Sequence, residues 1–300
     1  METILQNLII GIQLGAVYAL IALGYTMVYG VLRLINFAHG DVYMIGAFVG
    51  LLLASRLGMA FAATPQGFTL VFILTVVICA LMGMLIERLA YRPLRGAPRI
   101  TALITAIGVS LLLEALAQLI FGADPKFFPT LFQLSTLRIG PIEVNQKYLV
   151  ILFASLVLMS ALAFIVTRTR LGKAMRATSY DREAAALMGI NVNQVISFTF
   201  AIGSALAAAA GLLVSAVTNV KIDPYVGVMP GLKAFVAAVL GGIGNIPGAL
   251  VGAMTMGIAE SFVASGKFST WRDAIAFILL ILILIFRPAG ILGRATTEKV

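Results

Sequence analysis

Long apolar runs recur along the whole sequence, and they constrain the fold more than any other feature. A helix needs about 20 apolar residues to cross the roughly 30 Å hydrocarbon core of a bilayer. Here 61% of the 300 residues are hydrophobic, 11% are charged and the mean hydropathy is +1.06. A soluble domain of this length cannot bury so much apolar side chain, so we predict an integral membrane protein.

The runs predict a polytopic all-α protein with about eight or nine transmembrane helices in a single domain, residues 1–300. Two of the later runs are short and flank the sequence GGIGNIPG, which predicts short or broken helices there. The total falls if the first of these two re-enters the membrane without crossing it. The expected spans are residues 5–29, 41–57, 68–89, 100–121, 148–167, 195–217, 231–240, 249–263 and 271–286.

The positions of the basic residues predict which loops face the cytoplasm. Lysine and arginine are enriched in cytoplasmic loops, so a net charge of +9 does not require a nucleic-acid partner. Nine crossings would place the N-terminus outside, residues 33–39 inside and the loop 122–147 outside. The basic residues cluster after the third, fifth and last spans: Arg88, Arg92, Arg95 and Arg99; Arg168, Arg170, Lys173, Arg176 and Arg182; Arg287, Arg294 and Lys299.

The segment LRLINFAHGD, residues 32–41, contains the only histidine of the chain, between two apolar runs. One interpretation is structural: Asn36 and Asp41 cap the adjoining helices, and His39 bonds backbone groups freed at the break. The alternative makes Asn36, His39 and Asp41 part of an inner gate or of a contact with another subunit, because polar groups near membrane depth are costly and often functional.

Three further polar residues fall inside predicted spans and are candidates for a gate or a solute pathway. These are Gln13, Glu114 and Glu260. An unpaired carboxylate in a membrane is costly, so each glutamate should pair, become neutral or face water. Bonding between helices is the competing explanation for each of them.

No catalytic, metal or cofactor site is expected from the sequence. It has no G-x-x-x-x-G-K-[ST] motif for nucleotide phosphates, and a single histidine cannot form a cluster of metal ligands. Short segments interrupted by glycine and proline occur in both halves, a pattern typical of the discontinuous helices that line transport pathways. These observations favour a transport protein over an enzyme.

The basic loop at residues 168–194 predicts a contact with another protein. Asp181 is placed to cap a short helix that continues through Glu183 to Met188, and Gly189 is placed to end it. A short amphipathic helix outside the membrane offers an apolar side for docking.

Three motifs resemble the permease family of branched-chain amino acid ABC transporters, the LivH type. GYTMVYGVLRLINFAHGDVYMIGAF (residues 24–48) resembles the start of these permeases, and VLGGIGNIPGALVGA (239–253) resembles their glycine-rich C-terminal signature. REAAALMGI (182–190) resembles the EAA loop, although the isoleucine-x-leucine-proline ending of many importers is absent. The residues that this match assigns to ATPase coupling are Arg182, Glu183, Ala184, Ala185 and Gly189.

The resemblance implies a permease in the bacterial inner membrane that has no ATPase site of its own. It implies a second homologous permease, two cytoplasmic ATP-binding subunits that contact loop 168–194, and a periplasmic protein that delivers leucine, isoleucine or valine. A urea or short-chain amide importer is the alternative, because related permeases share these motifs. An ion-coupled secondary transporter, with Glu114 or Glu260 as the ion site, is a further alternative.

Overall fold

The computed structural model describes residues 2–129, 136–139, 142–266 and 268–293, and helices dominate these residues. The strands are short. β1 (Lys126–Phe127) pairs antiparallel with β4 (Lys221–Ile222), and β2 (Thr136–Ile139) pairs antiparallel with β3 (Ile142–Asn145). The predicted all-α class is confirmed. The predicted basic residues Arg294 and Lys299 lie outside the described residues.

Each predicted apolar run contains a helix, and seven of the described helices are long and apolar enough to cross a membrane. Of the two runs predicted to form short or broken helices, residues 231–240 lie in a helix of 14 residues, as expected, whereas residues 249–263 lie in one of 20 residues that is long enough to cross a membrane. The last apolar helix has 13 residues. The long helices are α1 (Glu2–Leu32), α2 (His39–Leu57), α4 (Pro65–Ile86), α5 (Arg99–Phe121), α6 (Gln146–Arg168), α9 (Val192–Thr218) and α11 (Ile246–Ser265); the short ones are α10 (Val228–Gly241) and α12 (Ala274–Phe286).

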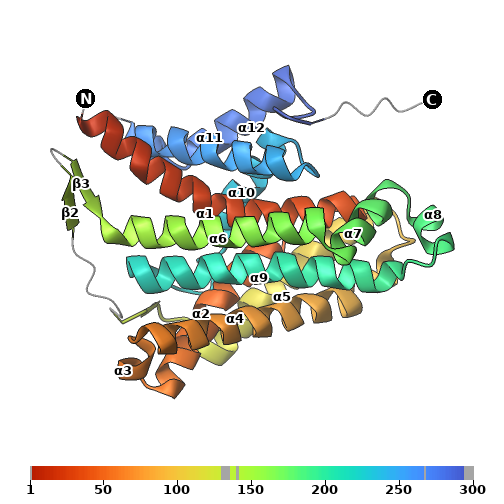
Figure 1. Cartoon of the computed structure of the whole chain (residues 1–300), viewed down its shortest axis with the longest axis horizontal. Helices are drawn as coiled ribbons and strands as arrows, with labels where there is room; N and C mark the ends of the chain where they lie inside the picture. Colours follow the sequence, from red (N-terminus) through yellow and green to blue (C-terminus); the bar gives the residue numbers. More distant parts are fainter. Residues whose placement is uncertain (1, 130–135, 140–141, 267, 294–300) are drawn as a thin grey trace.

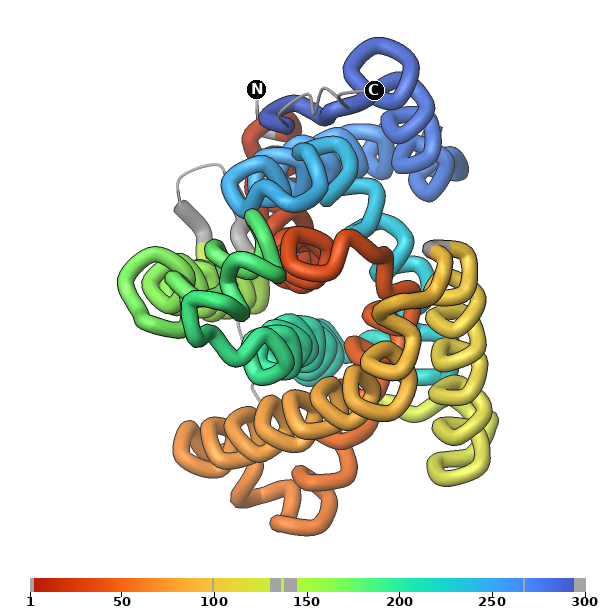
Figure 2. Tube along the Cα trace, turned by 90° about the vertical axis from the view of Figure 1, so that its right-hand side faces the viewer, coloured from red at the N-terminus to blue at the C-terminus, as the bar shows by residue number. Residues whose placement is uncertain are grey.

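Helices α1 and α9 form the centre of the bundle, and α4, α5, α6 and α11 surround them (Figure 2). The most apolar window of α9 is 83% buried, whereas the corresponding windows of α4 and α5 are each 22% buried. A helix that is apolar all round and exposed needs an apolar solvent, which a bilayer or another membrane subunit supplies. The chain is a multi-pass membrane protein.

Small residues bring α1 and α11 into close contact. A Cβ atom added to Gly15 would lie 2.9 Å from Cα of Met254, so the two backbones leave no room for a side chain there. In a membrane, such close approach provides the dispersion contacts that hold helices together.

Short elements gather at the two ends of the bundle (Figure 1). Helices α7 (Arg170–Tyr180) and α8 (Arg182–Leu187) lie at one end, here called the α8 end, and β2 and β3 lie at the opposite end, here called the hairpin end. The remaining short elements are α3 (Met59–Ala62), the π-helix η1 (Glu87–Tyr91) and the 3-10 helices η2 (Arg92–Leu94) and η3 (Ser269–Trp271).

Candidate coupling segment and solute pathway

The short helix α8 begins and ends where the sequence predicts. Oδ1 of Asp181 accepts a hydrogen bond of 3.0 Å from the backbone N–H of Ala184, which satisfies a donor in the first turn. Gly189 has φ of +82°, in the left-handed region that glycine adopts most readily at the end of a helix. Asp181 and Gly189 therefore fix a helix of six residues between them.

One side of α8 is buried and the other protrudes from the bundle. Ala185 is buried, whereas Leu187 and Met188 are 88% and 83% exposed. Glu183 and Ala184 are exposed as well. Exposed large apolar side chains next to a charged loop are typical of a protein contact. The α8 segment therefore presents a surface suited to docking.

Arg182 fastens α8 to the end of α1. Its Nε and Nη2 atoms donate hydrogen bonds of 3.1 and 2.8 Å to the carbonyl oxygen of Val31. This carbonyl belongs to the last turn of α1, where carbonyl groups lack partners within the helix. Burial and the positive charges of Arg95 and Arg33 lower the pKa of Arg182. Arg182 thus joins a loop to a central helix that lies about 150 residues earlier in the chain.

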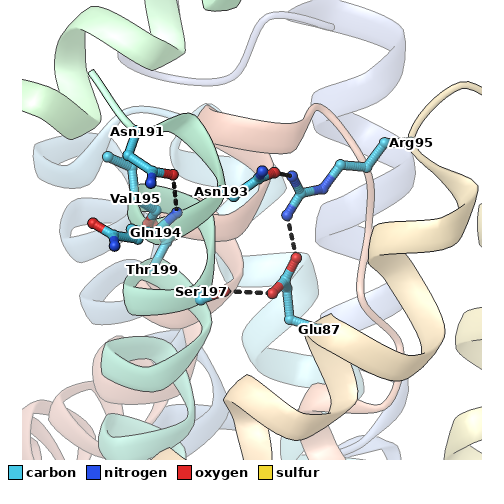
Figure 3. Close-up of polar contacts among 8 residues, drawn as sticks. All are labelled: Glu87, Arg95, Asn191, Asn193, Gln194, Val195, Ser197 and Thr199. Carbon is cyan, nitrogen blue, oxygen red and sulfur yellow. Dashed lines mark hydrogen bonds and ion pairs between the residues drawn. The ribbon is translucent and has the colours of Figure 1, made fainter. Parts of the chain in front are cut away.

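Glu87 connects the loop after α4 to the start of α9, which follows α8 in the chain (Figure 3). Its buried carboxylate accepts a hydrogen bond of 2.5 Å from Oγ of Ser197 and forms an ion pair with Arg95. Arg95 also donates to Oδ1 of Asn193. The sequence analysis missed this cluster, although Glu87 is the only acidic residue in the predicted span 68–89. That single carboxylate in an apolar run was the available signal.

The capping roles predicted for Asn36 and Asp41 are wrong. Helix α2 begins at His39 after Ala38, and no side chain caps it. Oδ1 of Asn36 accepts a hydrogen bond of 2.6 Å from the hydroxyl of Tyr91. Oδ2 of Asp41 accepts one of 2.5 Å from the hydroxyl of Ser110 on α5. Both side chains are buried, so hydroxyl groups on other elements satisfy them in place of the helix end.

One interpretation predicted that His39 bonds backbone groups at the break between α1 and α2. Instead, its side chain lies between α1 and α9. Its ring packs edge-on against Tyr25 with centroids 4.7 Å apart. A Cβ atom on Gly24 would overlap the imidazole, and a Cβ atom on Gly203 of α9 would lie 3.6 Å from Cε1 of the same ring. Among the described residues, Nε2 of His39 has no hydrogen-bond partner. Gly24 therefore provides the space that the histidine occupies.

At the hairpin end, Glu260 forms the centre of a buried ionic cluster. Its carboxylate accepts hydrogen bonds from the hydroxyl of Tyr18 at 2.8 Å, Nζ of Lys233 at 2.8 Å and Nε of Arg272 at 2.7 Å. Lys233 also pairs with Asp273 at 2.6 Å. The pairing expected for Glu260 is present. The sequence analysis missed Lys233, the only charged residue in the predicted span 231–240.

The six candidate gate or pathway residues do not form one site. Gln13 lines a cavity of about 630 Å³ at the hairpin end, together with Tyr18 and Lys233 of the Glu260 cluster. Asp41 and Glu114 line a smaller cavity of about 190 Å³ between α2, α5 and α10. Asn36 lies nearer the α8 end, bonded to Tyr91 of η1. The structure therefore separates a group at the hairpin end, a group between α2, α5 and α10, and Asn36 nearer the α8 end.

Comparisons with known proteins agree with this architecture. The chain is 43% identical to the high-affinity branched-chain amino acid transport system permease protein BraD of Pseudomonas aeruginosa, across 99% of this chain and 98% of the relative. It is 44% identical to the corresponding permease protein LivH of Escherichia coli K12, across 99% of this chain and 97% of the relative. A probable LivH permease of Methanocaldococcus jannaschii is 30% identical across 91% of this chain and 88% of the relative.

A solved structure described as an inward-facing conformation of a metal-chelate type ABC transporter shares the fold. Its TM-score is 0.51 at 18% identity, and the match covers 94% of this chain and 85% of that one. The family model for the branched-chain amino acid transport system permease component matches residues 7–284. With this match over most of its length, the chain belongs to the family of branched-chain amino acid transport permease components.

Proposed function

We propose that this chain is the permease subunit of an ABC importer that moves leucine, isoleucine and valine across the bacterial inner membrane. Residues 1–300 would act as one transmembrane domain beside a second, homologous permease. Two cytoplasmic ATP-binding subunits would hydrolyse ATP, and a periplasmic amino-acid-binding protein would deliver the solute. The family membership and the relatives over nearly the whole chain support this proposal.

The contact between Arg182 and Val31 is the observation that carries the mechanism. Leu187 and Met188 point away from the bundle, where an ATP-binding subunit can contact them, while Arg182 holds the carbonyl of Val31. A displacement of α8 would therefore reach α1 directly. Loop 168–194 acts as the coupling segment, with Arg182 as its link to the bundle and Glu183, Ala184, Ala185 and Gly189 forming the docking helix and its end.

The cluster of Glu87, Arg95, Asn193 and Ser197 is a second connection between the coupling segment and the bundle. Arg95 and Ser197 bind one carboxylate, and Ser197 lies in the first turns of α9, which follows the coupling segment in the chain. A motion of the coupling segment would then reach α4 and α9 together. Alternating access requires helices that have two arrangements, and ATP binding must favour one of them through contacts that differ between the two.

The candidate pathway residues have distinct roles in this proposal. Asn36, bonded to Tyr91, and His39, packed between α1 and α9, act at the inner gate. Asp41 and Glu114 line the pathway in the middle of the bundle. Gln13 and Glu260 belong to the outer cavity at the hairpin end.

Uptake by cells that lack this chain tests the proposal. Radiolabelled leucine and urea are supplied in parallel, with and without the chain restored from a plasmid. The proposal predicts that leucine uptake is lost and then restored while urea uptake is unchanged. If urea uptake alone follows the chain, the importer carries a different solute. If leucine uptake collapses with the proton gradient while ATP is maintained, the chain is a secondary transporter.

A further inference from the structure

The cavity at the hairpin end has the properties of a small-molecule site. Its volume of about 630 Å³ falls within the range of about 300–1,000 Å³ found for ligand pockets. Residues of α1, α2, α9, α10 and α11 contribute to it, so it lies among the buried helices of the bundle. Most of its wall is apolar, formed by residues that include Leu14, Val17, Val214, Val220, Val226 and Met229.

Charged residues of both signs border this apolar cavity: Lys233, Arg272 and Asp273 line it, and the buried Glu260 lies behind Lys233 and Arg272. Lys233 and Arg272 carry positive charge, and Glu260 and Asp273 carry negative charge. Charged groups within a membrane protein are costly to desolvate and are by default candidates for a functional site. Cationic and anionic groups on one cavity wall suit a ligand that itself carries one positive and one negative group.

Glu260 acts as a positioning residue. It accepts three hydrogen bonds and is completely buried, so it holds Tyr18, Lys233 and Arg272 in place. The terminal nitrogens Nη1 and Nη2 of Arg272 have no partner among the described residues. The Asp273 carboxylate is 62% exposed and pairs with Nζ of Lys233 at 2.6 Å.

Two neutral polar groups in the same cavity lack partners. Gln13 is 6% exposed and Tyr43 is 3% exposed, and both side chains line the cavity. Neither the amide of Gln13 nor the hydroxyl of Tyr43 has a hydrogen-bond partner among the described residues. Buried polar groups in proteins are nearly always satisfied, so a water molecule or a ligand is expected to bind them.

We propose that this cavity is the site where the permease receives the solute, and that it recognises the zwitterionic head group of an α-amino acid. The carboxylate of the amino acid binds Arg272 and Lys233, and its ammonium group binds Asp273. Gln13 and Tyr43 supply neutral hydrogen bonds, and the aliphatic side chain lies against the apolar wall. This inference rests on the proposed function and adds the substrate determinant, because urea has neither a pair of opposite charges nor an aliphatic chain.

Equilibrium binding to the purified complex of permease and ATP-binding subunits, without the binding protein, tests the site. Labelled leucine is the probe. Its competitors are 4-methylpentanoate, which lacks the ammonium group, 3-methylbutylamine, which lacks the carboxylate, and urea. We expect leucine to compete at least tenfold better than either singly charged analogue and urea not to compete. Equal competition by leucine and the uncharged or singly charged compounds would overturn the proposal.

Three variants separate recognition from folding. Asp273→Asn removes an exposed carboxylate. Lys233→Met combined with Glu260→Gln removes a buried ion pair and keeps the net charge of the cluster, because the partly exposed Arg272 and Asp273 remain as one positive and one negative charge. We expect each to weaken leucine binding at least tenfold and to raise the KM for uptake, with normal amounts of protein in the membrane. Lys221→Met, at an exposed lysine of the same end, is the matched control and should bind leucine as the wild type does.

The outcomes also distinguish this inference from the proposed function. If the wild-type complex transports leucine and both cavity variants bind it normally, the cavity is not the site and the importer proposal stands. If the double variant transports normally, the ionic cluster only holds α10, α11 and α12 together. If the wild-type complex transports no leucine, the proposed function itself is wrong.

Discussion

The guanidinium group of Arg182 holds the carbonyl oxygen of Val31 with two hydrogen bonds, of 3.1 and 2.8 Å. This contact joins the start of α8 to the last turn of α1. It makes a mechanical link between the surface that we assign to the ATP-binding subunits and the central helix of the bundle.

Replacing Arg182 with lysine should uncouple ATP hydrolysis from transport. A lysine has a single nitrogen and cannot reproduce the forked contact of a guanidinium. Loss of one hydrogen bond to a charged group corresponds to about 1.5–3 kcal/mol, so we expect leucine uptake per ATP hydrolysed to fall roughly tenfold or more. Arg170→Lys, at an exposed arginine of the same segment, is the control. An unchanged ratio in Arg182→Lys would show that the contact does not couple the two processes.

The loss of leucine uptake in Gly189 variants should depend on how well the new residue tolerates a positive φ. Leucine at φ of +82° is strained by about 1–2 kcal/mol, whereas asparagine adopts this region more readily. We expect Gly189→Leu to reach the membrane in normal amount, to retain ATP hydrolysis in the complex and to lose leucine uptake. Gly189→Asn should keep most of the uptake. Normal uptake in Gly189→Leu would contradict the role of α8 in coupling.

Removing the carboxylate of Glu87 should destabilise the bundle more than removing both partners of its ion pair. Breaking a buried pair from one side costs about 3–5 kcal/mol because a lone charge remains. We therefore expect the unfolding temperature of Glu87→Gln in detergent to fall further than that of the double variant Glu87→Gln, Arg95→Gln. Equal shifts would mean that water already screens Arg95 in the single variant.

A methyl group at position 24 should collide with His39. Overpacking a filled core costs about 1–3 kcal/mol, so Gly24→Ala should lower the free energy of unfolding by that amount. Because the collision is with the imidazole, adding His39→Ala should recover part of the loss. If the double variant is no more stable than the sum of the two single changes predicts, the two positions do not interact.

The sequence was sufficient to predict the helices and the local features of the coupling segment. Apolar runs report the spans because lipid requires them, and Asp181 and Gly189 act on backbone groups within three residues. These features depend on neighbours in the chain, which a sequence displays directly.

The partners of the polar residues were not predictable in the same way. Asn36 bonds Tyr91, 55 residues away, and Glu260 bonds Tyr18, 242 residues away. Asn36 and Asp41 are residue types that often cap helices, but their side chains instead accept hydrogen bonds from hydroxyl groups on other elements. Lys233 was visible as the only charge in the predicted span 231–240 and Glu87 as the only carboxylate in the span 68–89, and treating each as a site would have located both clusters.

Leucine accumulation in proteoliposomes tests the central claim most directly. The vesicles contain this chain, a second homologous permease and the ATP-binding subunits, with the binding protein and labelled leucine on the opposite side from ATP. We predict accumulation that requires hydrolysable ATP, persists when ion gradients are collapsed and disappears in Gly189→Leu. Accumulation that needs an ion gradient but not ATP, or the same rate without this chain, would contradict the account.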